Sequence, residues 1–434
     1  MRWRYLIPLV LVTLVFFACA TPAPAPAPAP TAIETVVFLD QNLEAAIRYA
    51  LSKPAGEAIT STELAGLTEL DAAQQGISNL SGIEYCIELT NLYLSYNRIG
   101  DISPLASLIN LSRLDLSVNQ INDLSPLSSL INLTNLYLSG NQISDLLLLA
   151  SLTNLEDLRL DSNQISDLSP LASITNLTFL YLSANQINDL SPLTSLTDLK
   201  DLRIDGNQIS DLYPLTSLTN LESLRLGGNQ IRDISSLASL TNLTYLYLSG
   251  NQIRNVSPLA SLSKLVELHL STNWIKDISP LASLLNLTLL DLYNNAISNV
   301  SALAPLTNLT MLDLASNQIS DLSPLASLTN LDNLRLGSNQ ISDVSPLASL
   351  TNLTILYLSV NQIIDISPLA SLTNIERLNL NSNQINDISP LVENSGLGEG
   401  DQLDLGNNAL DLSEGSEDLE DIRQLEGRGV MVYY

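Results

Sequence analysis

The chain is dominated by a 22-residue pattern in which leucines recur at fixed spacing among polar residues. One copy, residues 111–127, reads L-x-x-L-x-L-x-x-N-x-I-x-D-L-S-P-L. About sixteen units can be aligned, from a degenerate copy at Gln75 to a last copy at Asn408. Between these two, an asparagine returns every 22 residues at Asn97, Asn119, Asn141, Asn163, Asn185, Asn207, Asn229, Asn251, Asn273, Asn295, Asn317, Asn339, Asn361 and Asn383.

Each unit predicts a short strand, a turn and a short helical return. In Leu114-x-Leu116 apolar and polar positions alternate, so the leucines face inward and the side chains between them face solvent. The Asn119 amide can bond backbone groups that the turn leaves unpaired, and equivalent asparagines stack into a ladder. Ser125 supplies a capping hydroxyl before Pro126, whose fixed φ starts a 3-10 or α helix. Since no unit can bury its leucines alone, we expect a curved α/β solenoid with one parallel sheet on its concave face.

Both ends of such a solenoid require a cover, because an open end exposes leucines and unpaired strand edges. Residues 40–53 carry apolar positions at helical spacing, and Thr60-x-x-Glu63 is a capping box that opens a second helix. At the other end, residues 417–426 predict an amphipathic helix and residues 430–434 a strand. The predicted segments are an export signal at 1–20, a Pro-Ala linker at 21–32, a helical N-terminal cap at 33–66, the repeats at 67–410 and a C-terminal cap at 411–434.

The repeat motif resembles that of the leucine-rich repeat superfamily, specifically the 22-residue class of the internalins, over residues 67–410. The resemblance implies a bacterial protein with a leucine-rich repeat solenoid and a helical N-terminal cap. It also implies that variable side chains facing outward from the sheet form the ligand surface.

The N-terminal residues read as an export signal, with a positive start, an apolar stretch up to Ala18 and small residues around Cys19. Two cleavage patterns compete. Either Cys19 becomes a lipidated N-terminus, as in a bacterial lipoprotein, or Ala18-Cys19-Ala20 is an A-x-A site and the mature protein is secreted. The alternating Pro-Ala run at 22–30 favours lipidation, because an extended polyproline II tether suits an anchored protein. A lipid at Cys19 would be the protein's one membrane contact.

The composition of the chain argues against two classes of function, nucleic-acid binding and catalysis. The formal net charge is −27, which argues against a nucleic-acid partner because such partners require basic surface. One histidine and two cysteines leave little for catalysis or transition-metal chemistry, so we expect no enzyme activity and no cofactor. Cys86 occupies a leucine position of the repeat, which predicts a buried and inert thiol.

Tyrosine and arginine, the residue types enriched at interface hot spots, recur on the predicted concave face. The candidate ligand-binding residues are Tyr93, Tyr137, Arg159, Phe179, Tyr181, Arg203, Arg225, Tyr245, Tyr247, His269, Arg335 and Tyr357. Arg159 and Arg203 each stand between aspartates at i ± 2, which predicts local pairing, whereas Arg225 is freer. The predicted hot region is Phe179, Tyr181, Arg203, Arg225, Tyr245 and Tyr247.

Two interpretations of this face stay open. In the first, it binds a protein or glycan ligand, and the chain is a non-enzymatic cell-surface or secreted binding protein with a role such as adhesion. In the second, the side chains form cross-strand ladders without a ligand, and the chain is a structural or self-associating envelope protein. Leu147 and Leu148, which replace Ser-Pro, and Trp274, which replaces Gln, would then mark self-contacts or simple drift.

Two other clusters have competing interpretations. His269 with Glu267, Asp291 and Asp313 could hold a divalent cation, or with Ser271 and Asp291 could mimic a hydrolytic triad, but ordinary surface charges are the favoured interpretation. An aspartate also follows most ladder asparagines by four residues. Capping of local backbone is favoured there over calcium binding.

Overall fold

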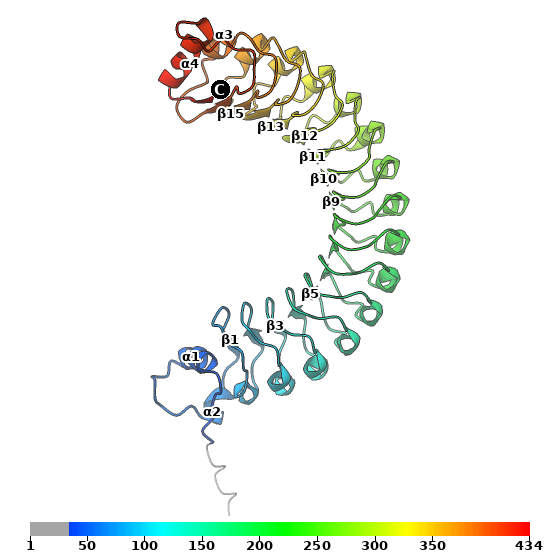
Figure 1. Ribbon diagram of the computed structural model, residues 1–434. Coiled ribbons are helices and arrows are strands. Elements are labelled where there is room, and N and C mark those ends of the chain that lie inside the picture. Colours follow the sequence, from blue (N-terminus) through cyan, green and yellow to red (C-terminus); the bar gives the residue numbers. More distant parts are fainter. Residues whose placement is uncertain (1–33) are drawn as a thin grey trace, which may run out of the picture.

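The computed structural model describes residues 34–434. The chain forms an open arc, with one parallel sheet along its inner side and short helical turns along its outer side (Figure 1). This is the leucine-rich repeat solenoid that the sequence predicts. The export signal, Cys19 and the Pro-Ala linker lie outside the described residues.

Seventeen three-residue strands make up the sheet. They are β1 Glu69–Asp71, β2 Asn91–Tyr93, β3 Arg113–Asp115, β4 Asn135–Tyr137, β5 Asp157–Arg159, β6 Phe179–Tyr181, β7 Asp201–Arg203, β8 Ser223–Arg225, β9 Tyr245–Tyr247, β10 Glu267–His269, β11 Leu289–Asp291, β12 Met311–Asp313, β13 Asn333–Arg335, β14 Ile355–Tyr357, β15 Arg377–Asn379, β16 Gln402–Asp404 and β17 Met431–Tyr433. From β1 to β15 each residue faces the residue 22 positions later, as in the pair Arg203 and Arg225. Side chains of one repeat column therefore stack along the arc.

The return legs are short 3-10 helices, from η1 Ile83–Tyr85 to η14 Ser367–Ser371. Between strand and return leg, each repeat contributes a full set of aliphatic side chains to one continuous core. In the third repeat these are Leu111, Leu114, Leu116, Ile121, Leu124, Leu127 and Leu130, none more than 3% exposed. Burial of each such side chain stabilises the fold by about 2 kcal/mol, but only when the neighbouring coils are in place.

The asparagine ladder is confirmed. Asn119 Oδ1 accepts the Ile99 amide of the preceding coil at 2.9 Å, while Asn119 Nδ2 donates to the Leu94 and Leu116 carbonyls at 2.9 and 3.1 Å. One amide thus satisfies three buried backbone groups on two coils. The same arrangement recurs along the array.

The helical returns are capped by aspartate, not by serine as the sequence predicted. Asp101 Oδ1 accepts the Ser103 amide at 2.8 Å, whereas the serine of the Ser-Pro pair makes no side-chain capping bond. The capping interpretation of the aspartate column is thereby confirmed, although Pro does occupy the start of most of these helices. The aspartate reaches the amide because it lies two residues before it, as in an Asx turn.

The caps have the predicted form. Helix α1 (Gln41–Ala50) begins after Asp40, which also accepts the Ser78 amide of the first repeat at 2.8 Å and so ties cap to array. Helix α2 (Ser61–Leu64) opens with the capping box of Thr60 and Glu63. The C-terminal cover consists of α3 (Ser389–Glu393), α4 (Glu417–Gly427) and β17.

Two further features bear on function. Cys86 is fully buried in the core, and burial raises the pKa of its thiol to about 12, so the prediction of an inert leucine substitute is confirmed. Among residues 34–434 the structure has no helix both long and apolar enough to cross a bilayer.

Candidate partner-binding face on the concave sheet

A stack of alternating arginine and tyrosine runs across the first half of the concave sheet. The guanidinium carbon of Arg159 lies 4.4 Å from the centre of the Tyr137 ring and 4.9 Å from that of Tyr181. Arg113 covers Tyr137 at 4.9 Å, and Arg203 covers Tyr181 at 4.0 Å. Because adjacent parallel strands stand ~4.8 Å apart, in-register neighbours meet face to face. These are cation–π contacts.

Carboxylates on every second strand lock this stack. The Tyr137 hydroxyl donates to Asp157 at 2.8 Å, and Asp157 also accepts two bonds from Arg159 on its own strand. The unit repeats 44 residues later, where Tyr181 donates to Asp201 at 3.0 Å and Arg203 pairs with the same carboxylate. Burial and the adjacent carboxylate raise the pKa of both Tyr137 and Tyr181. Both arginines are paired, as predicted.

Burial separates these predicted site residues into two classes. Tyr137 and Tyr181 are only 8% and 9% exposed, so the expectation that they present rings to a ligand is wrong. Neighbouring guanidinium groups cover their faces, and the carboxylate of the next strand binds their hydroxyls. Phe179 and Tyr245, at 40% and 41%, are exposed. They lie two residues before the stacked column, where the adjacent strands place Asp157 and Asp201 beside Phe179, and Ser223 and Glu267 beside Tyr245. No arginine of a described neighbour therefore covers either ring.

The stack is interrupted between β7 and β8, where Arg203 faces Arg225 directly. Arg225 covers the Tyr247 ring at 4.2 Å but makes no ion pair with a described residue. Its Nε and the Oδ1 of Asp201 are buried without a hydrogen-bond partner among the described residues. Beneath them, burial raises the pKa of Asp205 despite the bond it accepts from the Gly227 amide. Two of the three buried side-chain polar atoms that lack a hydrogen-bond partner among the described residues therefore lie at this interruption, and the third is Nε of Arg113.

We call Phe179, Arg203, Arg225, Tyr245 and Tyr247 the central patch. It spans β6 to β9 and combines an unpaired cation with exposed aromatic rings. Of the predicted hot region, Phe179 and Tyr245 are exposed and Arg225 has no ion pair with a described residue. Arg203 is paired with Asp201, Tyr247 lies between Arg225 and His269, and Tyr181 is a buried support. The sequence analysis missed the cross-strand bonds from tyrosine to carboxylate, although the 20-residue spacing of Tyr137 and Asp157 was a readable signal.

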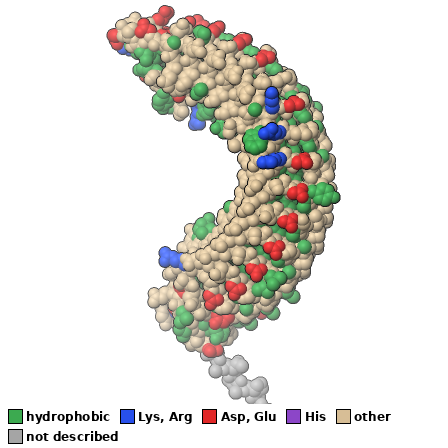
Figure 2. Space-filling view, turned by 45° about the vertical axis from the view of Figure 1, so that its right-hand side comes forward, with side chains coloured by type: hydrophobic (Ala, Val, Ile, Leu, Met, Phe, Trp, Pro, Cys, Tyr) green, Lys and Arg blue, Asp and Glu red, His purple; other side chains and the backbone are tan. Residues whose placement is uncertain are grey.

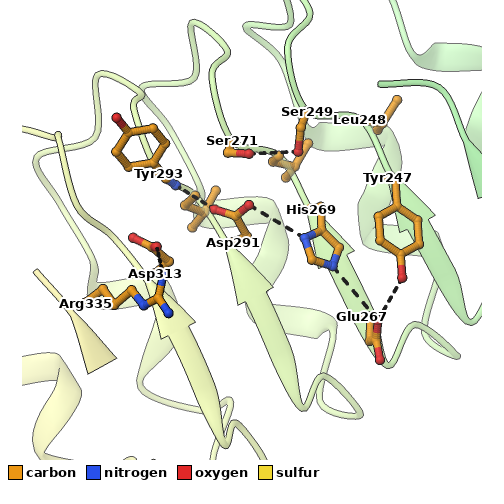
Figure 3. A network of polar contacts seen from close by, with 12 residues as sticks. Tyr247, Leu248, Ser249, Glu267, His269, Ser271, Asp291, Tyr293, Asp313 and Arg335 are labelled. Atoms are coloured by element: carbon orange, nitrogen blue, oxygen red, sulfur yellow. Dashed lines mark hydrogen bonds and ion pairs between the residues drawn. The ribbon is translucent and has the colours of Figure 1, made fainter. Parts of the chain in front are cut away.

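A polar network surrounds His269 on the neighbouring strands (Figure 3). Its ring stacks on Tyr247 with centroids 4.4 Å apart, and its two nitrogens lie 3.9 Å from Glu267 and 3.6 Å from Asp291. Tyr247 donates to Glu267 at 2.9 Å. Burial alone would raise the pKa of Asp291, but the bonds from His269 and the Tyr293 amide outweigh it and lower that pKa.

This network fits neither alternative chemistry. The Ser271 hydroxyl donates to Ser249 at 2.8 Å and not to the imidazole, so no serine is activated as a nucleophile (Figure 3). Within residues 34–434 no group of three or more His, Cys, Asp and Glu side chains has an arrangement that could hold a metal ion. The imidazole instead stacks on the Tyr247 ring and so extends the stacked side chains to β10.

The remaining candidates lie toward the two ends. Tyr93 is half-buried and faces Arg113 at 5.7 Å. Arg335 covers Tyr357 at 5.6 Å and lies 3.8 Å from Asp313. Beside Tyr357 is a small cavity of about 160 Å³, lined also by Arg377 and Tyr433. Exposed rings also occur at the C-terminal end, where Tyr433 and Tyr434 are 57% and 52% exposed, but no arginine described there has a buried Nε without a partner, as Arg225 has.

Comparison with known proteins agrees with this architecture. The family model described as Leucine Rich repeats (2 copies) matches residues 87–129, 131–173, 175–217, 219–261, 307–349 and 351–393. A second model, Leucine rich repeat, matches residues 263–319. Among curated proteins no match is found.

Solved structures provide a nearer comparison. The chain is 41% identical to an internalin (inlF) from Listeria monocytogenes, with 79% of this chain and 95% of that chain covered and a TM-score of 0.67. It is 26% identical to the Leptospira interrogans LRR protein LIC12759, with 86% and 97% covered and a TM-score of 0.79. The functional domain of InlJ from Listeria monocytogenes, at 24% identity and a TM-score of 0.68, shares the fold. The chain belongs to the leucine-rich repeat family and is a bacterial protein of the internalin type.

Proposed function

We propose that the protein is a non-enzymatic binding protein of the bacterial cell envelope or surface, and that it recognises a protein partner with the central patch. Internalin-type leucine-rich repeat proteins generally mediate protein–protein interactions. The observation that carries the proposal is Arg225, a partly buried guanidinium without an ion pair among the described residues.

The chemistry of the patch fits a polypeptide. A partner carboxylate placed between Arg203 and Arg225 would relieve the repulsion of two adjacent cations and supply charge-assisted bonds. Phe179 and Tyr245 on either side offer apolar area that loses little side-chain entropy on binding. A glycan with an acidic group is the alternative ligand, because aromatic rings also stack on sugars.

Export and lipid anchoring at Cys19 are part of the same proposal. They rest on the residues around Cys19 and on the Pro-Ala run at 22–30. Metabolic labelling with a palmitate analogue tests the anchor. The label should enter the parent chain and be absent from Cys19→Ser, whereas an unlabelled parent would favour secretion.

Capture from envelope and culture extracts tests the concave site. The parent chain is compared with Arg225→Ala/Tyr245→Ala and with a control, Arg98→Ala/Tyr213→Ala, which changes the same residue types at exposed positions off the patch. A partner retained by parent and control but lost by the patch variant supports the proposal. Equal capture by all three chains contradicts it.

A second candidate function, lateral self-association, has one observation in its favour. Leu147 and Leu148 are 65% and 38% exposed on η4 (Leu147–Ser151), where most other repeats have Ser-Pro. Analytical ultracentrifugation of the parent against Leu147→Ser/Leu148→Pro tests it. A concentration-dependent dimer that this variant abolishes would support self-association, and a monomeric parent would exclude it.

A further inference from the structure

Three adjacent repeats carry a basic residue at one position on the flank of the solenoid, three residues after the ladder asparagine. They are Arg232, Arg254 and Lys276, and all three are exposed. No other repeat has a basic residue there: the position is Ser78, Gly100, Asn122, Ser144, Ser166, Asn188, Ser210, Ser298, Ser320, Ser342, Ile364 and Asn386, and Asp411 in the last copy. Figure 2 shows basic side chains in a short row beside the long row of acidic ones.

The same short stretch carries a further departure from the repeat. Trp274 stands where most repeats have Gln, and it is 48% exposed. The Arg254 guanidinium carbon lies 5.0 Å from the centre of its ring. Arg232 Nε donates to the Gln252 side chain at 2.8 Å. Contacts with neighbouring side chains therefore orient both arginines. We call Arg232, Arg254, Lys276 and Trp274 the basic row.

The fold does not neutralise these cations. Arg232, Arg254 and Lys276 form no ion pair with the residues that the structure describes. The nearest acids in sequence, Asp233 and Asp277, accept the amides of Ser235 and Ser279 at 2.9 Å as caps. Next to Arg254 the aspartate column is itself interrupted by Asn255.

The scaffold also has no structural need for the basic row. Equivalent strands stand ~4.8 Å apart, so three like charges in register repel one another. Serine occupies the position in six other complete repeats without any change of the coil. A concentrated cation row in a chain of net charge −27 is therefore a departure from the repeat that folding does not explain.

We infer that the basic row binds an anionic polysaccharide that lies along the flank of the solenoid. A linear acidic polysaccharide carries acidic groups at regular intervals along one extended chain, so it can bring several of them to a row of cations. The exposed part of the Trp274 ring offers an apolar surface against which a sugar ring can pack. This site is separate from the central patch and does not depend on the proposed function.

The surroundings favour this ligand over broad anionic surfaces. The basic row is narrow and runs beside the aspartate column, which includes Asp211, Asp233 and Asp277. A lipid bilayer or a folded acidic protein would contact both rows and be repelled by the aspartates. A single extended chain can follow the cations and avoid the acids. Nucleic acid would require more cations to offset the overall negative charge.

Binding of two defined polymers to the full-length chain tests the inference. The probes are dextran sulfate and polygalacturonic acid, each compared with neutral dextran at low and physiological salt. The variant Arg232→Ser/Arg254→Ser/Lys276→Ser restores the residue of other repeats and should fold normally. The control Arg98→Ser/Lys200→Ser/Lys264→Ser makes the same change in net charge at exposed positions elsewhere.

We expect the parent and the control to bind at least one acidic polymer and to ignore neutral dextran, and the basic-row variant to lose binding by about tenfold or more. Trp274→Gln should weaken binding of the acidic polysaccharide with unchanged salt dependence, since it removes no charge. Failure of both acidic polymers to bind the parent, or equal loss in the control, would overturn the inference. The inference would also be overturned if poly-glutamate, single-stranded DNA or phosphatidylglycerol vesicles bound as tightly as the acidic polysaccharides, because the site would then recognise negative charge alone.

Discussion

Arg203 lies over the ring of Tyr181, with its guanidinium carbon 4.0 Å from the ring centre, while the Tyr181 hydroxyl donates to Asp201 beside that arginine. All three groups are thereby engaged within the sheet. The relationship divides the concave face into buried residues that hold the surface flat and exposed residues that are free to meet a partner. It also explains why Arg225, which faces Arg203 without a carboxylate on its own strand, stands out.

Removal of the Tyr181 hydroxyl should weaken the fold and leave the exposed contact groups in place. Tyr181→Phe deprives buried Asp201 of one donor, so the free energy of unfolding in urea should fall by about 1 kcal/mol. Tyr245→Phe is the control, because the Tyr245 hydroxyl bonds no described residue, and it should unfold like the parent. Equal effects of the two changes would contradict the division into supporting and exposed residues.

The asparagine ladder should dominate local stability. Asn251→Ala removes the acceptor of the Ile231 amide and the donor to the Leu226 and Leu248 carbonyls, at a cost of about 3 kcal/mol. Faster hydrogen exchange at Ile231 would be the direct sign. Asn220→Ala removes a single exposed bond to the Thr197 carbonyl and should cost under about 1 kcal/mol. A ladder variant as stable as this control would refute the assigned role.

The residue before each ladder asparagine has left-handed backbone. Val360 is held there at φ 55°, which is unfavourable for a β-branched side chain, whereas four repeats have glycine. Val360→Gly should therefore raise the free energy of unfolding by about 1 kcal/mol. The reverse change, Gly228→Val, has room for its Cβ but should destabilise by a similar amount, because Gly228 has a φ of 63°. Opposite signs in the two melting temperatures are the expected readout.

The capping aspartates predict a specific loss of stability in acid. Bonds from the Ser-Pro serines lower the pKa of Asp123, Asp167 and Asp189 in the folded chain. A group whose pKa is lower when folded contributes stability above its unfolded pKa of about 4, and that contribution disappears as pH falls through the folded pKa. Melting temperature should accordingly drop below about pH 4.

Asparagine provides the matched control for this titration. Asn255 and Asn299 cap their serine amides at 2.9 Å in natural repeats, so Asp123→Asn/Asp167→Asn/Asp189→Asn keeps the bond and removes the charge. The variant should lose less stability than the parent between pH 6 and pH 2.5. An identical acid profile for both chains would show that these aspartates are not responsible.

The 22-residue period explains how much of the fold could be predicted from the sequence. The period fixes which leucines are buried and which asparagines stack, because every coil repeats the same environment. Burial of Tyr181 could not be read in this way, since it depends on Arg159 and Arg203 of the adjacent strands and on a hydroxyl reaching Asp201. The serine cap failed because both Ser and Asp are good caps, and only backbone geometry decides between them.

The basic row was within reach of the sequence but was missed. Arg232, Arg254 and Lys276 are the only basic residues of their repeat column, whereas the departure predicted next to them from the sequence was Trp274 alone. Conversely, the sequence does show why Phe179 and Tyr245 are exposed, because none of their column neighbours, such as Asp201 and Ser223, is an arginine that could cover the ring. In a repeat array, each variable residue is best compared with the residues at the same position of the other repeats, and on every face of the solenoid.

Site-specific photo-crosslinking tests the central claim most directly. A benzophenone side chain at Tyr245 on the concave face is compared with one at Tyr213, which is 73% exposed on η7 (Tyr213–Ser217) of the outer side. With envelope extract, the Tyr245 position should give a discrete adduct with a second protein, and Arg225→Ala should abolish it. The Tyr213 position should give none. Identical adducts from both positions, or adducts from Tyr213 alone, would contradict a partner site on the central patch.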